Sequence, residues 1–294
     1  MQSAKAELFA RVDTKLGEGP AWIDGALWYV DILGELIGRV RAGGDGKALG
    51  IDRWPVGDMV GALAPRRGGG LVLALKDRFA AFDPESGETT DLAHPPGIGP
   101  NVRFNDGKCD PRGRFIAGTM GLKGEPEVGK LYSLAHDHSV STLIESVSIS
   151  NGLAWCRDGH IFYYIDTPTR RVRAFDYDIE TGEIANERTV VNIPEHLGRP
   201  DGMTIDQEGN LWIAQFGGSG VGCWGHSTGE LMEWIEVPAP NVTSCTFGGP
   251  GLDRLYITTA NLKRSAEGTA AENAGSIFVC APGVRGYAPA PYAG

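Results

Sequence analysis

The sequence predicts an all-β fold, a six-bladed β-propeller, on three observations. A similar unit recurs along the 294 residues, starting near positions 18, 60, 105, 151, 201 and 244, so that its length is 42 to 50 residues. The 43 glycines fall mostly in short turns, and no long helical periodicity is present. A repeat of 40–50 residues with about four strands is the size of one propeller blade. No linker or composition break interrupts it, so we expect residues 1–294 to form a single domain.

The elements of a unit can be read in order from the better copies. A polar residue opens the unit, an apolar stretch follows, and a turn glycine comes seven or eight residues after the polar residue. An apolar and aromatic strand then begins. We expect these strands at 27–30, 115–117, 161–164 and 211–214. The unit that starts at Asn151 continues with strands near 171–176 and 186–191, joined by a turn around Gly182. Four strands per unit make a blade.

Composition excludes several classes of function. The formal net charge is −10 and the pI is about 5.1, which disfavours nucleic acid and anionic membranes as partners. The five cysteines are widely spaced, with no CxxC pair, which is typical of reduced thiols in a cytoplasmic protein. The N-terminus has no signal-peptide pattern, and no apolar run reaches the length of a membrane span. A closed ring hides strand edges, so we expect a monomer or a weak dimer.

Oxygen-bearing side chains recur at one phase of the repeat. Glu18, Asn105, Asn151 and Asp201 each open a unit, whereas the second and sixth units have Val60 and Ser244 there. Residues at one phase of a closed ring converge on its axis. Carboxylate and amide oxygens suit Ca²⁺, Mg²⁺ or Mn²⁺, and Zn²⁺ also accepts carboxylates. Such residues before glycine are also common turn formers, but turn formation does not require a shared phase. The pattern therefore predicts one divalent cation on one side of the channel.

Two neighbours of Asn105 extend this site. Arg103 lies two residues before Asn105, on the same face of an extended segment, where its guanidinium can bind substrate oxygens. Asp106 can orient Asn105 or a water molecule, and we assign it to the substrate site. The glycine-rich segment 121–129 is either a lid or an ordinary hairpin loop. No GxSxG, HExxH, P-loop or dinucleotide-binding pattern is present, so nucleophilic serine catalysis and nucleotide cofactors have no support.

Several longer strings resemble the senescence marker protein 30 (SMP-30)/gluconolactonase/regucalcin-like family. The strings are LGEGPAW (16–22), RFNDGKCDPRGRFIAGTM (103–120), ISNGLAW (149–155), IFYYIDT (161–167), AFDYDIETG (174–182), PDGMTIDQEGNLWIA (200–214) and TSCTFGG (243–249). The resemblance implies a six-bladed propeller with one divalent metal in its channel. It implies that Glu18, Asn151 and Asp201 hold the metal, that Arg103 and Asn105 contact the substrate, and that Asp201 is the general base.

One position departs from the resemblance. In the loop after the GTM string the family has an acid that helps to bind substrate, whereas this chain has Lys123 at the aligned position. We assign Lys123 to the substrate site, and we expect the departure to alter the choice of substrate.

The sequence therefore predicts a metal-dependent sugar lactonase that hydrolyses an aldonolactone to the open-chain acid. Three alternatives remain: a phosphotriesterase-like hydrolase that uses the same metal site, a non-catalytic calcium-binding regulatory protein, and a protein-interaction propeller. The last is disfavoured because the repeats lack WD and kelch signatures.

Overall fold

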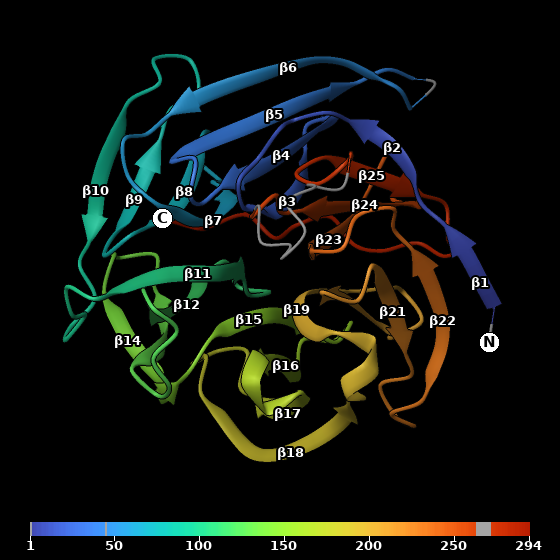
Figure 1. The fold of residues 1–294 in the computed structure, drawn as a ribbon. Helices are drawn as coiled ribbons and strands as arrows, with labels where there is room; N and C mark the ends of the chain where they lie inside the picture. The colour runs from blue at the N-terminus through green and yellow to red at the C-terminus, as the bar shows by residue number, and fades with distance from the viewer. Residues whose placement is uncertain (1, 45, 263–271) are drawn as a thin grey trace.

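The computed structural model describes residues 2–44, 46–262 and 272–294, and it confirms the six-bladed β-propeller. Six sheets, antiparallel except for one added edge strand, are arranged around a central channel, and Figure 1 looks along this channel. In each blade the first strand in sequence lies innermost, except that the N-terminus supplies outer strands to the last two blades. Among the described residues the helical elements are two single 3₁₀ turns, η1 (Thr167–Thr169) and η2 (Glu195–Leu197). No described helix is long and apolar enough to cross a bilayer.

The strands of each blade follow one another from the channel outward. Blade 1 consists of β3 (Gly17–Ile23), β4 (Ala26–Asp31), β5 (Leu36–Ala42) and β6 (Ala48–Pro55). Blade 2 consists of β7 (Val60–Pro65), β8 (Leu71–Leu75), β9 (Phe79–Phe82) and β10 (Thr89–Ala93). Blade 3 consists of β11 (Val102–Cys109), β12 (Phe115–Gly121), β13 (Gly129–Leu134) and β14 (Val140–Val147).

The second half of the ring repeats this order. Blade 4 consists of β15 (Ser150–Trp155), β16 (Ile161–Asp166), β17 (Arg171–Tyr177) and β18 (Ile184–Asn192). Blade 5 consists of β19 (Arg199–Ile205), β20 (Leu211–Phe216), β21 (Gly220–Trp224) and β22 (Leu231–Glu236), with β1 (Gln2–Lys5) added at its outer edge. Blade 6 consists of β23 (Val242–Gly248), β24 (Arg254–Thr259), β25 (Ile277–Cys280) and, outermost, β2 (Glu7–Ala10).

The two N-terminal strands close the ring. β2 pairs antiparallel with β25, so one sheet joins the beginning of the chain to its end, and β1 pairs parallel with β22 of the neighbouring blade. In Figure 1 both blue strands lie beside the orange and red blades. The C-terminal segment crosses the channel at the end where the innermost strands finish. It is fastened there by the bridges of Asp206 with Gly286 and of Arg66 with Tyr292.

The apolar core lies between blades and not on the axis. Six separate hydrophobic clusters fill the six interfaces between neighbouring blades. Inner strands are buried on both faces, as in β15, where every residue is buried, whereas most residues of the outer strand β18 are exposed. This explains why the inner strands appear in the sequence as nearly continuous apolar runs. Because the blades pack against each other, the channel is free to hold polar side chains.

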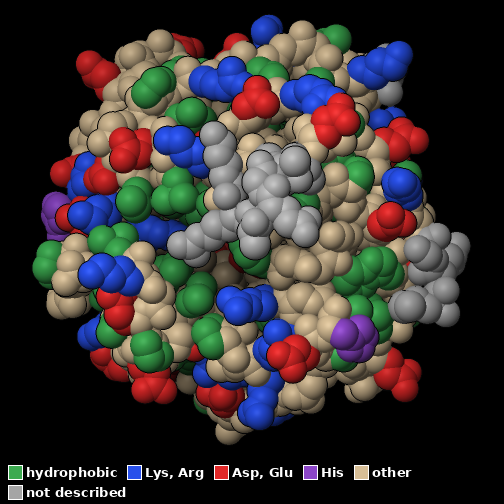
Figure 2. Space-filling model, in the orientation of Figure 1, with side chains coloured by type: hydrophobic (Ala, Val, Ile, Leu, Met, Phe, Trp, Pro, Cys, Tyr) green, Lys and Arg blue, Asp and Glu red, His purple; other side chains and the backbone are tan. Residues whose placement is uncertain are grey.

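The surface carries charges of both signs. Figure 2 shows Lys and Arg side chains interspersed with Asp and Glu side chains over the face that is seen in Figure 1. The net charge of −10 is therefore not gathered into one acidic patch on this face. The acids that matter for function must be sought inside the channel.

Candidate metal centre and substrate site

Every innermost strand has an irregularity at the same depth in the channel. The pairing of the first and second strands slips between Glu18 and Ala21, and equivalent slips occur in the other five blades. A β-bulge bends a strand and redirects a side chain. The repeated position seen in the sequence therefore corresponds to one depth in the channel, because the bulges lie at or next to the predicted positions. Blades 1, 4 and 5 contribute Glu18, Asn151 and Asp201 at this depth.

Three acidic side chains are buried together at this level. Glu18, Asp106 and Asp201 are 4%, 7% and 7% exposed. Burial raises the pKa of Glu18 well above its usual value, and the charges of Asp201 and Asp106 raise it further. Burial likewise raises the pKa of Asp201, with Asp106 as the second cause. Among the described residues, each carboxylate accepts a hydrogen bond only from the backbone amide of the glycine that follows it. Their negative charge is left largely uncompensated by hydrogen-bond donors.

Other buried acids of this chain are satisfied. Asp110 accepts hydrogen bonds from Arg114 Nε at 2.7 Å and from the Tyr177 hydroxyl at 2.6 Å, besides two backbone amides. Asp206 accepts from two backbone amides and from the Trp212 indole. A buried carboxylate normally finds such partners, because its desolvation otherwise costs several kcal/mol. The contrast distinguishes these two acids, which have several donors, from the channel acids, which have few.

The positive charge of Arg103 acts on two of these acids, Glu18 and Asp201, and lowers the pKa of each. Burial lowers the pKa of its guanidinium to about 10, while the charges of Glu18 and Asp201 act in the opposite direction. Its Nη1 donates hydrogen bonds to the carbonyl oxygen of Phe104 at 2.9 Å and to Asn105 Oδ1 at 2.7 Å. Arg103 therefore offsets part of the charge of Glu18 and Asp201, while the charge of Lys108 lowers the pKa of Asp106 against the effect of burial. The sequence prediction that Arg103 and Asn105 share a face is confirmed by this contact.

The two asparagines form a chain of hydrogen bonds across blades 3, 4 and 5. Asn105 Nδ2 donates to the carbonyl oxygen of Ser150 at 2.7 Å and to Asn151 Oδ1 at 2.9 Å. Asn151 Nδ2 donates to Thr167 Oγ1 at 2.8 Å, and that hydroxyl donates to the carbonyl oxygen of Pro200 at 2.8 Å. These contacts direct the amide oxygen of Asn151 away from Thr167. Thr167 was not singled out by sequence reasoning, although it ends the string 161–167.

The donor set fits a hard divalent cation. In the described part of the chain, no three His, Cys, Asp or Glu side chains form a set of metal ligands by themselves. A cation at this level would therefore use carboxylate and amide oxygens together, as Ca²⁺ and Mg²⁺ do in proteins. The uncompensated charge of Glu18 and Asp201, together with the oriented amide oxygen of Asn151 in blade 4, next to the blade of Asp201, supports this fit. This is the set that the family resemblance implied, whereas the repeat also placed Asn105 in it, whose Oδ1 accepts a hydrogen bond from Arg103.

Asp106 and Lys123, the other two predicted site residues, lie outside this set of proposed ligands. Asp106 is buried with the acids, and it also borders a second cavity deeper in the channel. Lys123 is exposed in the loop between β12 and β13, where its backbone amide donates to Glu125 Oε2 at 3.0 Å. Among the described residues it has no hydrogen bond or ion pair with the buried group. The loop itself leaves β12 beside β11, since the amide of Leu122 donates to the carbonyl oxygen of Asn101.

Lys108 belongs to one of the strings that carry the resemblance, but its role was not predicted. Its Nζ donates to the carbonyl oxygen of Met203 at 2.8 Å, which joins blade 3 to blade 5 across the channel. Burial lowers the pKa of this ammonium group, and the charge of Asp106 partly opposes the shift. The sequence alone could not predict the contact between Lys108 and Met203, because it depends on the distance between two blades.

Comparisons with known proteins show which family the chain belongs to. Residues 16–261 match the model of the SMP-30/gluconolactonase/LRE-like region. Regucalcin of Danio rerio is 42% identical over 300 residues, which cover all of both chains. Among solved structures, a luciferin-regenerating enzyme is 33% identical with a TM-score of 0.87, covering 95% of this chain and 96% of the other. A calcium-binding protein, regucalcin, from Agrobacterium tumefaciens is 26% identical with a TM-score of 0.92, covering 99% of each chain. The chain therefore belongs to the SMP-30/gluconolactonase/LRE-like family.

Proposed function

We propose that this protein is a divalent-metal-dependent lactonase that hydrolyses sugar lactones of the aldonolactone class to their open-chain acids. The observation that supports it most strongly is the group of buried acids Glu18, Asp106 and Asp201, which lack compensating donors at one level of the channel. Membership of a family that is named in part for gluconolactonase supports the reaction class.

Glu18, Asn151 and Asp201 would hold the cation. When bound there, a divalent cation supplies Lewis-acid polarisation of an ester carbonyl and stabilises developing negative charge. The chain's own groups do the rest. Arg103 donates from a buried position, so it can orient ring hydroxyls or the ring ester, and Asn105 holds Arg103 in place through a 2.7 Å contact.

Asp201 is the proposed general base. Hydrolysis breaks the bond between the lactone carbonyl carbon and the ring oxygen, while a water oxygen bonds to that carbon. One water proton is accepted by Asp201, and the ring oxygen leaves as a hydroxyl after taking up a proton. Burial raises the pKa of Asp201 in the channel without a metal, whereas a bound cation would favour the ionised carboxylate, which is the form that accepts a proton.

The decisive experiment measures acid release from a panel of lactones with a pH indicator. Metal-stripped protein should be inactive, and adding back Ca²⁺, Mg²⁺, Mn²⁺ or Zn²⁺ one at a time should restore turnover. Asp201→Asn should reduce the rate by about 10²-fold or more, because a base and a ligand are lost together. Full activity of the stripped protein, or of Asp201→Asn, would contradict the proposal.

A calcium-binding role without catalysis is the second candidate, because the A. tumefaciens neighbour is described as a calcium-binding protein. This role predicts tight calcium selectivity and no turnover of any lactone. A single oxygen site without an EF-hand loop should instead accept several divalent cations.

A fluorophosphate substrate in the same panel separates the lactonase from a phosphotriesterase-like hydrolase.

A further inference from the structure

The channel contains a second cavity on the far side of the acids. It measures about 200 Å³ and lies in the half of the channel toward which the innermost strands run. The C-terminal segment lines the cavity at the opposite side from the acids, through Tyr287, Ala288, Pro289 and Ala290. Asp106 lines this cavity and also belongs to the acidic group, so the cavity adjoins the acids.

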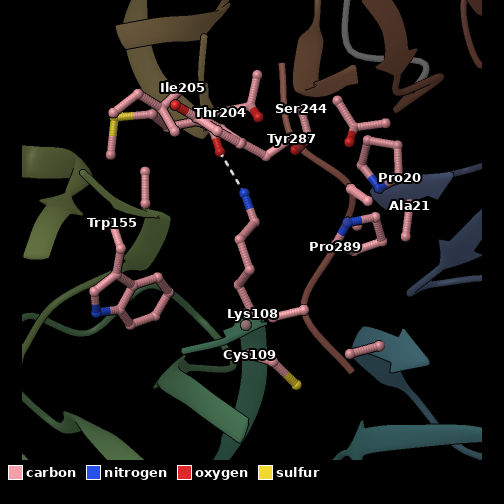
Figure 3. A pocket seen from close by; sticks show the side chains of 18 of the residues that line it. Pro20, Ala21, Lys108, Cys109, Trp155, Thr204, Ile205, Ser244, Tyr287 and Pro289 are labelled. Carbon is pink, nitrogen blue, oxygen red and sulfur yellow. Dashed lines mark hydrogen bonds between the residues drawn. The ribbon is translucent and has the colours of Figure 1, made fainter. Parts of the chain in front are cut away.

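The size of this cavity follows from small side chains at matching places in the ring. Five of the six innermost strands present Ala or Thr to it at this place: Ala21, Ala64, Ala154, Thr204 and Thr246. The sixth, β11, presents Lys108. In Figure 3 Lys108 extends through the middle of the cavity, with Trp155 on one side and Pro289 and Ala21 on the other. One long cationic side chain in a ring of small ones is an arrangement that can recognise a charged ligand.

The cations that line the cavity have no acidic partner in direct contact. Lys108 makes one hydrogen bond, to the carbonyl oxygen of Met203 at 2.8 Å, and no ion pair among the described residues. Asp106 Oδ1 is occupied by the amide of Gly107 at 2.7 Å. Arg157, an exposed residue that lines the outer part of the cavity, also has no ion pair in the described part of the chain. The cavity therefore has a cation inside and another where it meets solvent.

The other walls are mainly apolar, and they include a buried polar group that has no partner among the described residues. Trp155, Ile205, Leu63 and Pro289 supply apolar surface. The hydroxyl of Tyr287 is buried and has no hydrogen-bond partner among the described residues. A buried hydroxyl normally has a partner, and a water molecule or a ligand in the cavity would provide one.

We propose that this cavity is a second ligand site, which binds a small monocarboxylate with an apolar body. The carboxylate pairs with the Lys108 ammonium and the apolar body packs against Trp155 and Pro289. A cavity of about 150 Å³ accommodates benzene, so this one accommodates a molecule of the size of benzoate. The proposal concerns a different space from the proposed lactonase site and does not depend on lactone hydrolysis.

Isothermal titration calorimetry of the full chain loaded with calcium, with benzoate and its neutral counterpart benzamide as probes, tests this site. We expect benzoate to bind with a dissociation constant on the order of 1 mM or lower, and benzamide at least about 10-fold more weakly, because a charge-assisted contact is lost. Lys108→Met should weaken benzoate by a similar factor. Thr204→Leu, which fills the cavity and keeps the cation, should also abolish most of the binding.

Two controls locate the binding. Lys5→Met removes an exposed lysine outside the cavity and should leave the affinity for benzoate unchanged. Asp201→Asn alters the proposed cation site and should leave benzoate binding within about twofold, since the carboxylate does not bind there.

Three results would overturn the proposal: no binding of benzoate, equal binding of benzamide, or binding that Asp201→Asn abolishes while Thr204→Leu does not. The comparison of the two probes needs no variant, so it decides the matter even if Lys108→Met or Thr204→Leu fails to fold.

Discussion

At the scale of single residues, the informative contrast is between buried carboxylates that are satisfied and those that are not. Asp110 and Asp206 each accept several hydrogen bonds and hold turns in place. Asp106, by contrast, raises the pKa of both Glu18 and Asp201, and each of these three acids has one backbone donor. Burying an uncompensated charge lowers the free energy of unfolding, so these three acids destabilise the protein when no metal is bound.

A first prediction follows for Asp106. Its pKa is raised by burial, so ionised Asp106 destabilises the metal-free protein above the raised pKa, and the cost disappears as the pH falls through that value. Asp106→Asn should therefore raise the Tm of metal-stripped protein by a few degrees at pH 8, and by much less near pH 5. Differential scanning calorimetry at both pH values measures this. In calcium-loaded protein the stabilisation should vanish, and a variant that is less stable at pH 8 without metal would contradict the assignment.

A second prediction concerns Thr167, which positions the amide of Asn151. Thr167→Val keeps the shape and removes the hydroxyl that accepts from Asn151 Nδ2 at 2.8 Å. Groups that orient metal ligands typically affect affinity by about 10- to 100-fold, so calcium or manganese affinity should fall by about 10-fold. The matched control is Thr169→Val, because the Thr169 hydroxyl donates to the carbonyl oxygen of Asp166 and not to the site. Titration calorimetry with both cations should separate the two variants, and equal affinities would refute the role of Thr167.

At the scale of elements, the bulges and the close packing of innermost strands place the site. Gly61 in β7 shows how tight this packing is. A Cβ at this position would lie 2.6 Å from the carbonyl carbon of Phe104 and 2.8 Å from the carbonyl oxygen of Asn105. Both are backbone atoms of β11, which cannot move aside as a flexible side chain can. A glycine in blade 2 therefore sets the backbone position of Phe104 and of the site residue Asn105 in blade 3, although it has no polar group.

Gly61→Ala should displace β11 and misplace Arg103 and Asn105. We expect a loss of about 1–3 kcal/mol of unfolding free energy from overpacking, with a large fall in kcat. Urea unfolding and lactone turnover measure the two effects. Gly99→Ala is the control, because a Cβ at that position would point into open space, with nothing within 4 Å, and the backbone there is not left-handed. Wild-type stability of Gly61→Ala would show that the blades are less tightly coupled than the distances indicate.

At the scale of the whole molecule, ring closure keeps the channel intact. The strand β2 supplies the outer edge of blade 6 and places Phe9 in the cluster between blades 6 and 1. Phe9 is 8% exposed and packs edge-on against Tyr256, with ring centroids 4.9 Å apart. The N-terminal strand thus joins the first and last blades through both hydrogen bonds and apolar contact.

Phe9→Ala should lower the unfolding free energy by about 3 kcal/mol or more, as is typical for a buried aromatic side chain. Its neighbour on the same strand, Leu8, is 41% exposed, so Leu8→Ala should cost less than about 1 kcal/mol. Urea unfolding followed by tryptophan fluorescence compares the two variants. Equal losses would mean that the closure depends on strand pairing alone.

Much of the fold could be predicted because the repeat is visible in the chain. The predicted starts near 18, 60, 105, 151, 201 and 244 coincide with the innermost strands. The first five units each supply four strands, as predicted, whereas the sixth supplies three described strands and takes β2 as its fourth. The exchange of β1 and β2 into the last two blades was not predicted, because pairing between residues more than 200 positions apart leaves no local pattern. The contacts of Lys108 with Met203 and of Asn151 with Thr167 were missed because they too depend on how separate strands pack.

By itself, the sequence determined the number of blades, the type of secondary structure and the residues that share one phase, because periodicity and turn chemistry are local properties. Only the tertiary structure decided which of the phased acids lack partners, how Arg103 and the two asparagines connect, and that a second cavity lies beyond Asp106. These properties depend on distances between blades, and such distances result from the packing of six apolar interfaces around a common axis.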